Sequence, residues 1–411
     1  MKVPRLLLWS AAALVLASYA MFLYRSREHV RLGWVDFRSM YTAAWMVRDG
    51  AGESLYQVPA QSEAFRRYSP NPMPLWFNHP PFEVPLFLPF TYLTFGRAYV
   101  AWLALSVVLV AALAGILARF SLAPSGLSSF AVTVACFTFF PVWYMFHEGQ
   151  DSIFIALAYT LAYAALVRNR ETWAGFLMGL GLYRFHLVLP VIFVFLLLRR
   201  WRVLGGFAGA CILLGLISLA VVGWEGTLRY PQFLLELNRH DSYGVIVPYH
   251  MPNLRGQALT FAAWRIPSVW IDVGVALVSL AVLLWVAGRW KRAEAQHATT
   301  SGLLMALTLT VTLVLSYHLN LQDLVVLLLP LSLVAQHLWQ TRDRKGPAHR
   351  ALQMSAAALF LPPVYEIPEW PDRTLVLFCL LVLFAAAIAA EVSAEEKVAV
   401  AGELKHEDGI A

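Results

Sequence analysis

Charged residues are scarce in this chain of 411 residues, where Asp, Glu, Lys and Arg together make up 14%. Soluble domains carry about 25% of these residues, and 59% of the chain is hydrophobic, so the composition excludes an ordinary soluble protein. The three cysteines all lie in apolar runs, which argues against a disulfide framework and a cysteine metal site. Glycine-rich nucleotide-binding motifs are also missing, which argues against a site for ATP or a nucleotide sugar. We therefore expect no metal, no cofactor and no nucleic-acid partner.

Long apolar runs predict an all-α polytopic membrane protein with about twelve spans, forming one integral-membrane domain over residues 1–391. The first run could instead be a signal peptide cleaved near Ala20. The run 83–95 holds two prolines and is too short to span, so we expect it to be re-entrant or interfacial. The charged tail 392–411 is predicted to be disordered and cytoplasmic. The twelve predicted spans are 6–24, 98–118, 126–146, 151–167, 172–183, 185–199, 204–223, 266–288, 301–317, 321–340, 351–363 and 373–391.

The distribution of Lys and Arg among the short loops predicts the orientation of the chain. With the N-terminus inside, the basic clusters at 199–202, 289–292 and 342–350 are cytoplasmic, and so are all five lysines. Residues 25–82 then form the first extracytoplasmic loop, with predicted interfacial helices over 38–47 and 59–67. Most of the remaining polar segments fall on the same outer side.

Asp36 is a lone acid between Trp34 and Phe37, about a dozen residues beyond the first apolar run. Aromatic neighbours can partly desolvate a carboxylate, which raises its pKa and suits it to act as a general base. The alternative is an ordinary loop acid that caps the helix predicted after it.

Two further polar segments lie close to predicted spans on the outer side. His79 stands at the corner before Pro80-Pro81, where it could contact a substrate phosphate, act in acid–base exchange or form an ordinary interfacial hydrogen bond. Gln150 and Asp151 belong to a tight polar turn between two spans and could face a water-filled cavity. Asp151 could equally cap the next helix.

Arg184 and His186 interrupt a long apolar stretch, where an arginine is costly unless it is paired. A lipid-linked phosphate is one possible partner, because arginine binds phosphate through a fork of donors. A salt bridge to Asp151 or Glu148 is the alternative.

The later outer segments carry a second group of polar residues. Asn253, Arg255 and Gln257 begin a predicted helix whose N-terminus would add donors for an anion. His318 and Asp323 lie in another short polar connection between two spans, which suits sugar hydroxyls or serves as a plain helix–helix turn.

The order of these motifs resembles glycosyltransferase family 87, the polyprenol-phosphate-mannose-dependent mannosyltransferases of the GT-C fold. The resemblance covers roughly residues 30–340 and implies a catalytic aspartate in the first extracytoplasmic loop, which matches Asp36. The chain departs from the family where Arg184-Phe-His replaces the usual Lys-Pro and where His79 replaces the tyrosine of Tyr-Pro-Pro. The motifs are Asp36-Phe37, Tyr41-x2-Ala44, Gly50, Leu55-Tyr56, Pro80-Pro81-Phe82, Gly149-Gln150, Ala174-Gly-x3-Gly179, Asn253-x3-Gln257 and Ser316-Tyr-His318.

The resemblance and the motifs together predict an inverting transfer of a hexose, expected to be mannose, from a polyprenyl-phosphate donor to a lipid, glycan or protein acceptor. Asp36 is the expected base, and Arg184, Arg255 and His318 are the expected phosphate ligands. His79, Gln150, Asp151, His186, Asn253, Gln257 and Asp323 are the expected substrate contacts. The expected location is the bacterial plasma membrane, with the site on the extracytoplasmic face. A lipid or sugar transporter or flippase is the competing class, although no paired half-chain repeats are present.

Overall fold

The computed structural model describes residues 5–67, 75–120, 129–239, 247–295, 301–365 and 374–408, and within these ranges it contains helices and no strands. The short 3-10 helices that matter below are η2 (Pro81–Leu86), η3 (Leu88–Tyr92), η4 (Gly181–Arg184) and η7 (Leu321–Leu327). The α-helices are α1 (Arg5–Arg25), α2 (Arg27–Arg31), α3 (Phe37–Arg48), α4 (Val58–Arg66), α5 (Phe95–Phe120), α6 (Ser129–Thr138), α7 (Phe140–Glu148), α8 (Ile153–Val167), α9 (Glu171–Leu180), α10 (Phe185–Leu197), α11 (Trp201–Arg239), α12 (Leu254–Ala262), α13 (Ser268–Ala295), α14 (Ser301–Leu315), α15 (Leu328–Gln340), α16 (Pro347–Ala358) and α17 (Leu375–Asp408).

Several helices are long and apolar enough to cross a membrane, so the chain is a multi-pass membrane protein. In the described ranges six elements meet that criterion, and α6 with α7 adds a seventh if the pair, bent by 60°, is one span. The structure thus does not confirm the predicted twelve spans. The six are Phe95–Arg119, Glu171–Leu197, Trp201–Leu237, Ser268–Ala295, Leu321–Gln340 and Leu375–Lys397.

Two differences from the prediction have local causes. The predicted spans 172–183 and 185–199 form one continuous element, Glu171–Leu197, because η4 carries the helical path through Arg184. The predicted span 351–363 overlaps α16, whose 12 residues extend only about 18 Å at 1.5 Å per residue, too short to cross. Residues 83–95 form η2 and η3, and their re-entrant character stays unconfirmed.

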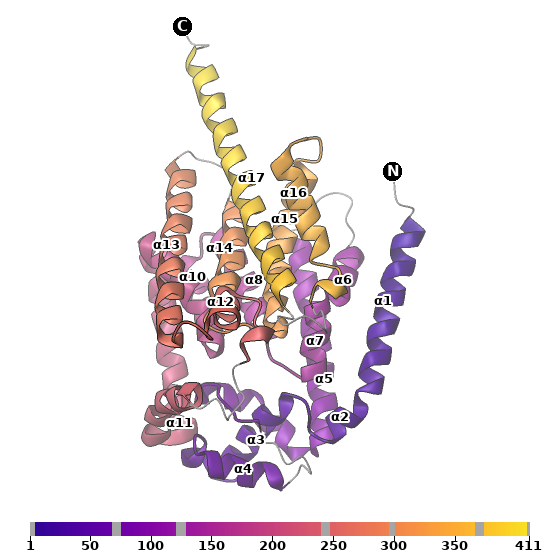
Figure 1. Cartoon of the computed structure of the whole chain (residues 1–411), viewed down its shortest axis with the longest axis vertical. Coiled ribbons are helices and arrows are strands. Elements are labelled where there is room, and N and C mark those ends of the chain that lie inside the picture. The colour runs from indigo at the N-terminus through magenta and orange to yellow at the C-terminus, as the bar shows by residue number, and fades with distance from the viewer. Residues whose placement is uncertain are drawn as a thin grey trace.

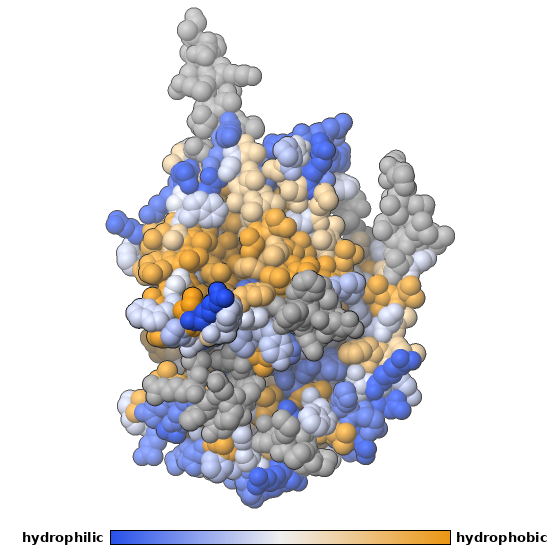
Figure 2. All heavy atoms as spheres, in the orientation of Figure 1, coloured by the Kyte–Doolittle hydropathy of each residue, from blue (hydrophilic) through white to orange (hydrophobic). Residues whose placement is uncertain are grey.

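The bundle has two distinct ends. In Figure 1, α1 begins and α17 ends at the upper end, whereas α2, α3 and α4 gather at the lower end. Figure 2 shows hydrophobic side chains in a band across the upper half of the face in view, with hydrophilic residues above and below it. This pattern is the one expected for a bundle that crosses a bilayer.

α14 is the central helix of the bundle. Every residue from Leu303 to Leu315 is buried, including three threonines whose hydroxyls face protein and not lipid. A short helix that is apolar on all sides belongs inside a larger helical assembly. α13 lies at the periphery, since large apolar side chains such as Leu277, Val278 and Trp285 are exposed along it.

Residues 27–66 form their own small helical layer, and helices are present where the sequence predicted them, as α3 and α4. Phe37, Tyr41 and Ala44 of α3 are buried in a second hydrophobic cluster with η2, η3 and the first turns of α5. α3 is therefore largely covered by protein and not by solvent.

The tail 392–411, predicted to be disordered, is helical in the structure as far as Asp408, where α17 ends. Glu396 of this segment pairs with Arg289 at 3.2 Å.

Two glycines let α9 and α11 approach each other closely. A Cβ atom placed on Gly175 would lie 1.8 Å from the carbonyl oxygen of Val203. A Cβ atom on Gly206 would lie 1.8 Å from the carbonyl oxygen of Thr172. Small residues allow such backbone contact between membrane helices, where van der Waals packing drives association.

We expect Gly206→Ala to lower the free energy of unfolding by about 1–3 kcal/mol, because the backbone must move apart to admit the methyl group. The matched control is Gly205→Ala on the exposed face of the same helix, where a Cβ atom meets nothing within 4 Å. That control should be neutral or stabilising, since alanine favours helix. Thermal unfolding of the purified protein in detergent measures both, and equal effects would contradict the close packing.

Candidate active site

A left-handed glycine brings the first loop against the end of α7. Gly149 follows α7 with φ of 65°, and a Cβ atom there would lie 2.7 Å from Cβ of Phe37. Glycine adopts this conformation without steric cost. The turn places Gln150 beside Asp36. Asp36 occupies the N-cap position of α3 but makes no capping hydrogen bond through its side chain. The capping role considered for Asp36 is thus not observed.

Asp36 is held by two residues from the end of α7. The Gln150 amide donates from Nε2 to Oδ2 of Asp36 at 2.8 Å, and the Asp36 backbone N–H donates to Oε2 of Glu148 at 3.3 Å. Burial, reinforced by the negative charge of Glu148, raises the pKa of Asp36 to about 7. A carboxyl group with that pKa can accept and release a proton near neutral pH.

Arg184 is buried within a set of acids and amides. Its NH2 donates to Oε1 of Gln150 at 2.6 Å and to Oδ1 of Asp151 at 2.7 Å, and its Nε lies 3.6 Å from Oδ1 of Asp323. This is the salt bridge that the sequence left open as the alternative to a phosphate contact. Since arginine only donates, it orients the Gln150 amide so that Nε2 must point at Asp36.

His79 lies in the same electrostatic neighbourhood and pairs with the acid one turn further on. Its Nδ1 is 2.7 Å from Oε2 of Glu83 in η2. Burial, together with the nearby charge of Arg184, lowers the pKa of His79 to about 3. His79 is therefore neutral at physiological pH. The ligand atoms of His79, Glu83 and Asp151 lie within 4.8 Å of one another, although Asp151 already has the Arg184 cation as its partner.

His186, His318 and Arg255 carry buried polar atoms that have no hydrogen-bond partner in the described chain. The atoms are His186 Nε2, His318 Nδ1 and Arg255 NH1. The two imidazole rings meet edge to face with centroids 6.0 Å apart, and burial lowers the pKa of His318 to about 4. Most buried polar atoms in proteins are satisfied, so a group of unsatisfied polar atoms points to a place where a ligand binds.

The other contacts of Arg255 fix its direction. Its Nε donates to Oδ1 of Asp272 at 2.7 Å, and its guanidinium lies over the Tyr317 ring at 4.0 Å from the centroid. Asn253 caps α12 by accepting from the Gly256 N–H and donates to the Ser316 carbonyl at 2.7 Å. These contacts hold the first turn of α12 against the loop that carries His318.

Asp36 opens onto a pocket of about 130 Å³. A cavity needs about 10–15 Å³ of this volume to hold one water molecule. The pocket therefore has room for several such molecules, or for a group the size of one sugar ring. Gln257 does not line the pocket itself. Its Nε2 donates a hydrogen bond at 3.2 Å to the hydroxyl of Thr374, which does line it. The lining residues come from segments far apart in the chain: Asp36, Tyr144, His250, Asn320, Leu321, Gln322, Tyr365 and Thr374.

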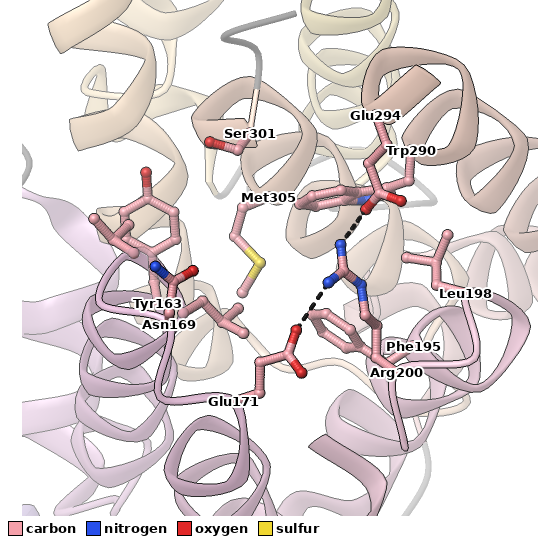
Figure 3. A pocket seen from close by; sticks show the side chains of 12 residues that line it. Tyr163, Asn169, Glu171, Phe195, Leu198, Arg200, Trp290, Glu294, Ser301 and Met305 are labelled. Carbon is pink, nitrogen blue, oxygen red and sulfur yellow. Dashed lines mark hydrogen bonds and ion pairs between the residues drawn. The ribbon is translucent and has the colours of Figure 1, made fainter. Parts of the chain in front are cut away.

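A second pocket, of about 170 Å³, lies where α13 ends and α14 begins, away from α3 and α4 (Figures 1 and 3). Figure 3 shows Arg200 bridging Glu171 and Glu294 across it, so the charged groups of this pocket already pair with one another. Since none of the residues predicted to bind substrate lines this pocket, we place the candidate active site around Asp36.

The structure brings most of the predicted residues together. Asp36, Gln150, Arg184, Asp151 and Asp323 form one connected network, and His79, His186, His318 and Arg255 are its electrostatic neighbours. Sequence reasoning missed two acids, Glu83 and Asp272, which pair with His79 and Arg255. The i,i+4 spacing of His79 and Glu83 could have revealed one of them, but the role of Asp272 gives no local signal.

The polytopic helical architecture and the buried polar network at one end describe a membrane-embedded enzyme that acts on a polar substrate. The family model for glycosyltransferase family 87 matches residues 76–316, more than half of the chain, and the chain therefore belongs to this family. No curated protein and no solved structure matches it. The protein is a membrane glycosyltransferase, a finding that gives the competing transporter interpretation no support. Because the match begins after Asp36, the role of that residue rests on its geometry.

The charges around Asp36 predict opposite shifts for two variants. Glu148→Gln removes the negative neighbour that raises the pKa of Asp36, so the midpoint of its protonation should fall below about 7. Gln150→Leu removes the hydrogen bond that favours the carboxylate, so the midpoint should rise. Infrared titration of the carboxylic acid band, assigned by its loss in Asp36→Asn, measures both. Glu63→Gln on exposed α4 is the control, and an unshifted Glu148→Gln midpoint would contradict the assigned coupling.

Proposed function

We propose that this glycosyltransferase moves a hexose, mannose in the first instance, from a polyprenyl-phosphate donor to a hydroxyl acceptor, with inversion at the anomeric carbon. The reaction takes place on the extracytoplasmic face of the bacterial plasma membrane. The observation that carries the proposal is a carboxyl group with a pKa of about 7, Asp36, at the edge of a pocket that suits one sugar ring.

The transfer needs one base and no covalent intermediate. The acceptor oxygen bonds to the anomeric carbon as its proton passes to the Asp36 carboxylate, and the bond from that carbon to the phosphate oxygen breaks. Polyprenyl phosphate leaves with the electron pair of that bond. A single carboxylate on the acceptor side is the arrangement that an inverting displacement requires, since the second acid of a hydrolase is replaced by a leaving group that is already anionic.

The leaving phosphate would be stabilised by the unsatisfied donors beside the network. Arg255 NH1 offers a charged N–H whose direction is fixed by the pair with Asp272, and a neutral His318 offers an N–H to a phosphate oxygen. Fixed donors at the site of developing charge lower the barrier without reorganisation. Arg184 is already paired with Asp151 and Asp323. We therefore assign it the role of a positioning residue that orients Gln150.

The acceptor would occupy the pocket beside Asp36. Gln322 and Asn320 supply amide groups to its hydroxyls, and Tyr144 and Tyr365 form part of the pocket wall. Those features suit a glycan or a lipid-linked sugar better than an apolar acceptor. The donor's tail would remain in the bilayer, and its head group would enter from the side of Arg255.

We expect Asp36→Asn to lower the rate of transfer by about 100-fold or more, since general bases contribute 10²–10⁴. The assay follows loss of polyprenyl-phosphate mannose with cell-envelope lipids as the acceptor source. Asp49→Asn at the other end of α3, on an exposed residue, is the matched control and should leave the rate unchanged. If Asp36→Asn retains full activity with normal folding, the assignment of the base fails.

Arg255→Gln should lower kcat by about 100-fold, the typical cost of losing one donor at a developing oxyanion. Asp272→Asn separates catalysis from structure, because it removes the ion pair but leaves the guanidinium in place. We expect this control to be much milder. Equal losses in both variants would mean that Arg255 serves only to hold α12 against α13.

A further inference from the structure

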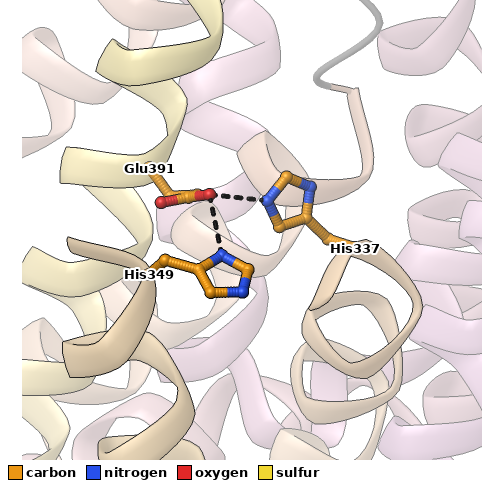
Figure 4. A group of neighbouring side chains, drawn as sticks. All are labelled: His337, His349 and Glu391. Atoms are coloured by element: carbon orange, nitrogen blue, oxygen red, sulfur yellow. Dashed lines mark hydrogen bonds and ion pairs between the residues drawn. The ribbon is translucent and has the colours of Figure 1, made fainter. Parts of the chain in front are cut away.

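A second cluster of titratable side chains lies apart from the candidate active site, towards the end of the bundle where α17 ends (Figure 1). His337 near the end of α15, His349 in the first turn of α16 and Glu391 of α17 point at one another, as Figure 4 shows. His337 Nε2 lies 3.0 Å and His349 Nδ1 lies 3.3 Å from the same atom, Oε1 of Glu391. Three helices thus contribute one ligand-type atom each.

The spacing of these atoms matches a tetrahedral metal site. Zinc binds imidazole nitrogen and carboxylate oxygen at about 2.0–2.1 Å, so two of its tetrahedral ligands lie about 3.3 Å apart. The two N···O distances, 3.0 and 3.3 Å, are close to this edge length. All three ligand atoms lie within 4.8 Å of one another, which leaves a position for one ion between them.

The surroundings leave room for a fourth ligand. His349 and Glu391 are buried, which shields an ion from water on that side. Glu395, one helical turn beyond Glu391, lies 3.9 Å from His337 Nε2 and pairs with Arg344. Its carboxylate, or a water molecule next to it, can complete four-coordination.

We propose that His337, His349 and Glu391 bind one divalent transition-metal ion of the zinc class, which fastens α15, α16 and α17 together. Two imidazoles and one carboxylate suit zinc, cobalt or nickel, whereas magnesium and calcium prefer oxygen ligands throughout. The expectation of no metal rested on the cysteines, and this site uses none. Its function is structural and does not depend on the transfer reaction.

Cobalt substitution tests the site directly. The full-length protein in detergent, stripped with a chelator and titrated with Co²⁺, should bind about one ion per chain and develop the visible absorption of a four-coordinate cobalt centre. Glu391→Gln keeps the side-chain volume but loses the anionic ligand. We expect it to weaken Co²⁺ binding by about 100-fold or more, since loss of even an outer-shell partner costs 10–100-fold. His337→Gln should do the same.

The matched control is His29→Gln, which removes an exposed imidazole from α2 and should leave cobalt binding unchanged. Wild-type protein that binds no Co²⁺ would overturn the proposal without reference to any variant, and would leave the three residues as a hydrogen-bonded group. Equal cobalt spectra in wild type and in Glu391→Gln would overturn it as well. Bound zinc that protects wild type but not Glu391→Gln from thermal unfolding would support the structural role.

Discussion

One buried guanidinium, that of Arg184, determines how the polar end of this bundle is arranged. It ties together η4, the turn after α7 and η7, because Asp151 and Asp323 both need its charge. Removing one partner of such a buried pair typically costs about 3–5 kcal/mol, since the other charge is left uncompensated. The Asp36 carboxylate joins this arrangement through the Gln150 amide. The position of Asp36 thus depends on a cation two contacts away.

Apolar packing provides the frame in which that charge can stay buried. α14 is enclosed from Leu303 to Leu315, and the α9–α11 contact at Gly175 and Gly206 leaves no space for a side chain between the helices. Close-packed interiors resist small displacements. Polar residues at the helix ends are therefore held in fixed directions although they lie in short connections, as a preorganised site requires.

The sequence predicted the membrane class, the family and the residues around Asp36, because charge in an apolar chain is costly and so marks function. It could not choose a partner for Arg184, since the pairing with Asp323 spans a long stretch of chain. Hydropathy also gives the length of an apolar run but not whether the helix continues past a polar residue. The polar residues at Arg184 therefore predicted two spans, 172–183 and 185–199, where the structure has the single element Glu171–Leu197. The composition of the charged tail predicts disorder because it does not reveal the partners in other helices, which are Arg289 for Glu396 and His337 for Glu395.

The pocket beside Asp36 is lined by residues from both ends of the chain, from Asp36 itself to Thr374 at the start of α17. Without Tyr365 and Thr374 this pocket would lack part of its wall, although Asp36 would keep its contact with Gln150 and Arg184 its pair with Asp151. The segment that leads into α17 thus completes a pocket whose other side is formed more than three hundred residues earlier in the chain.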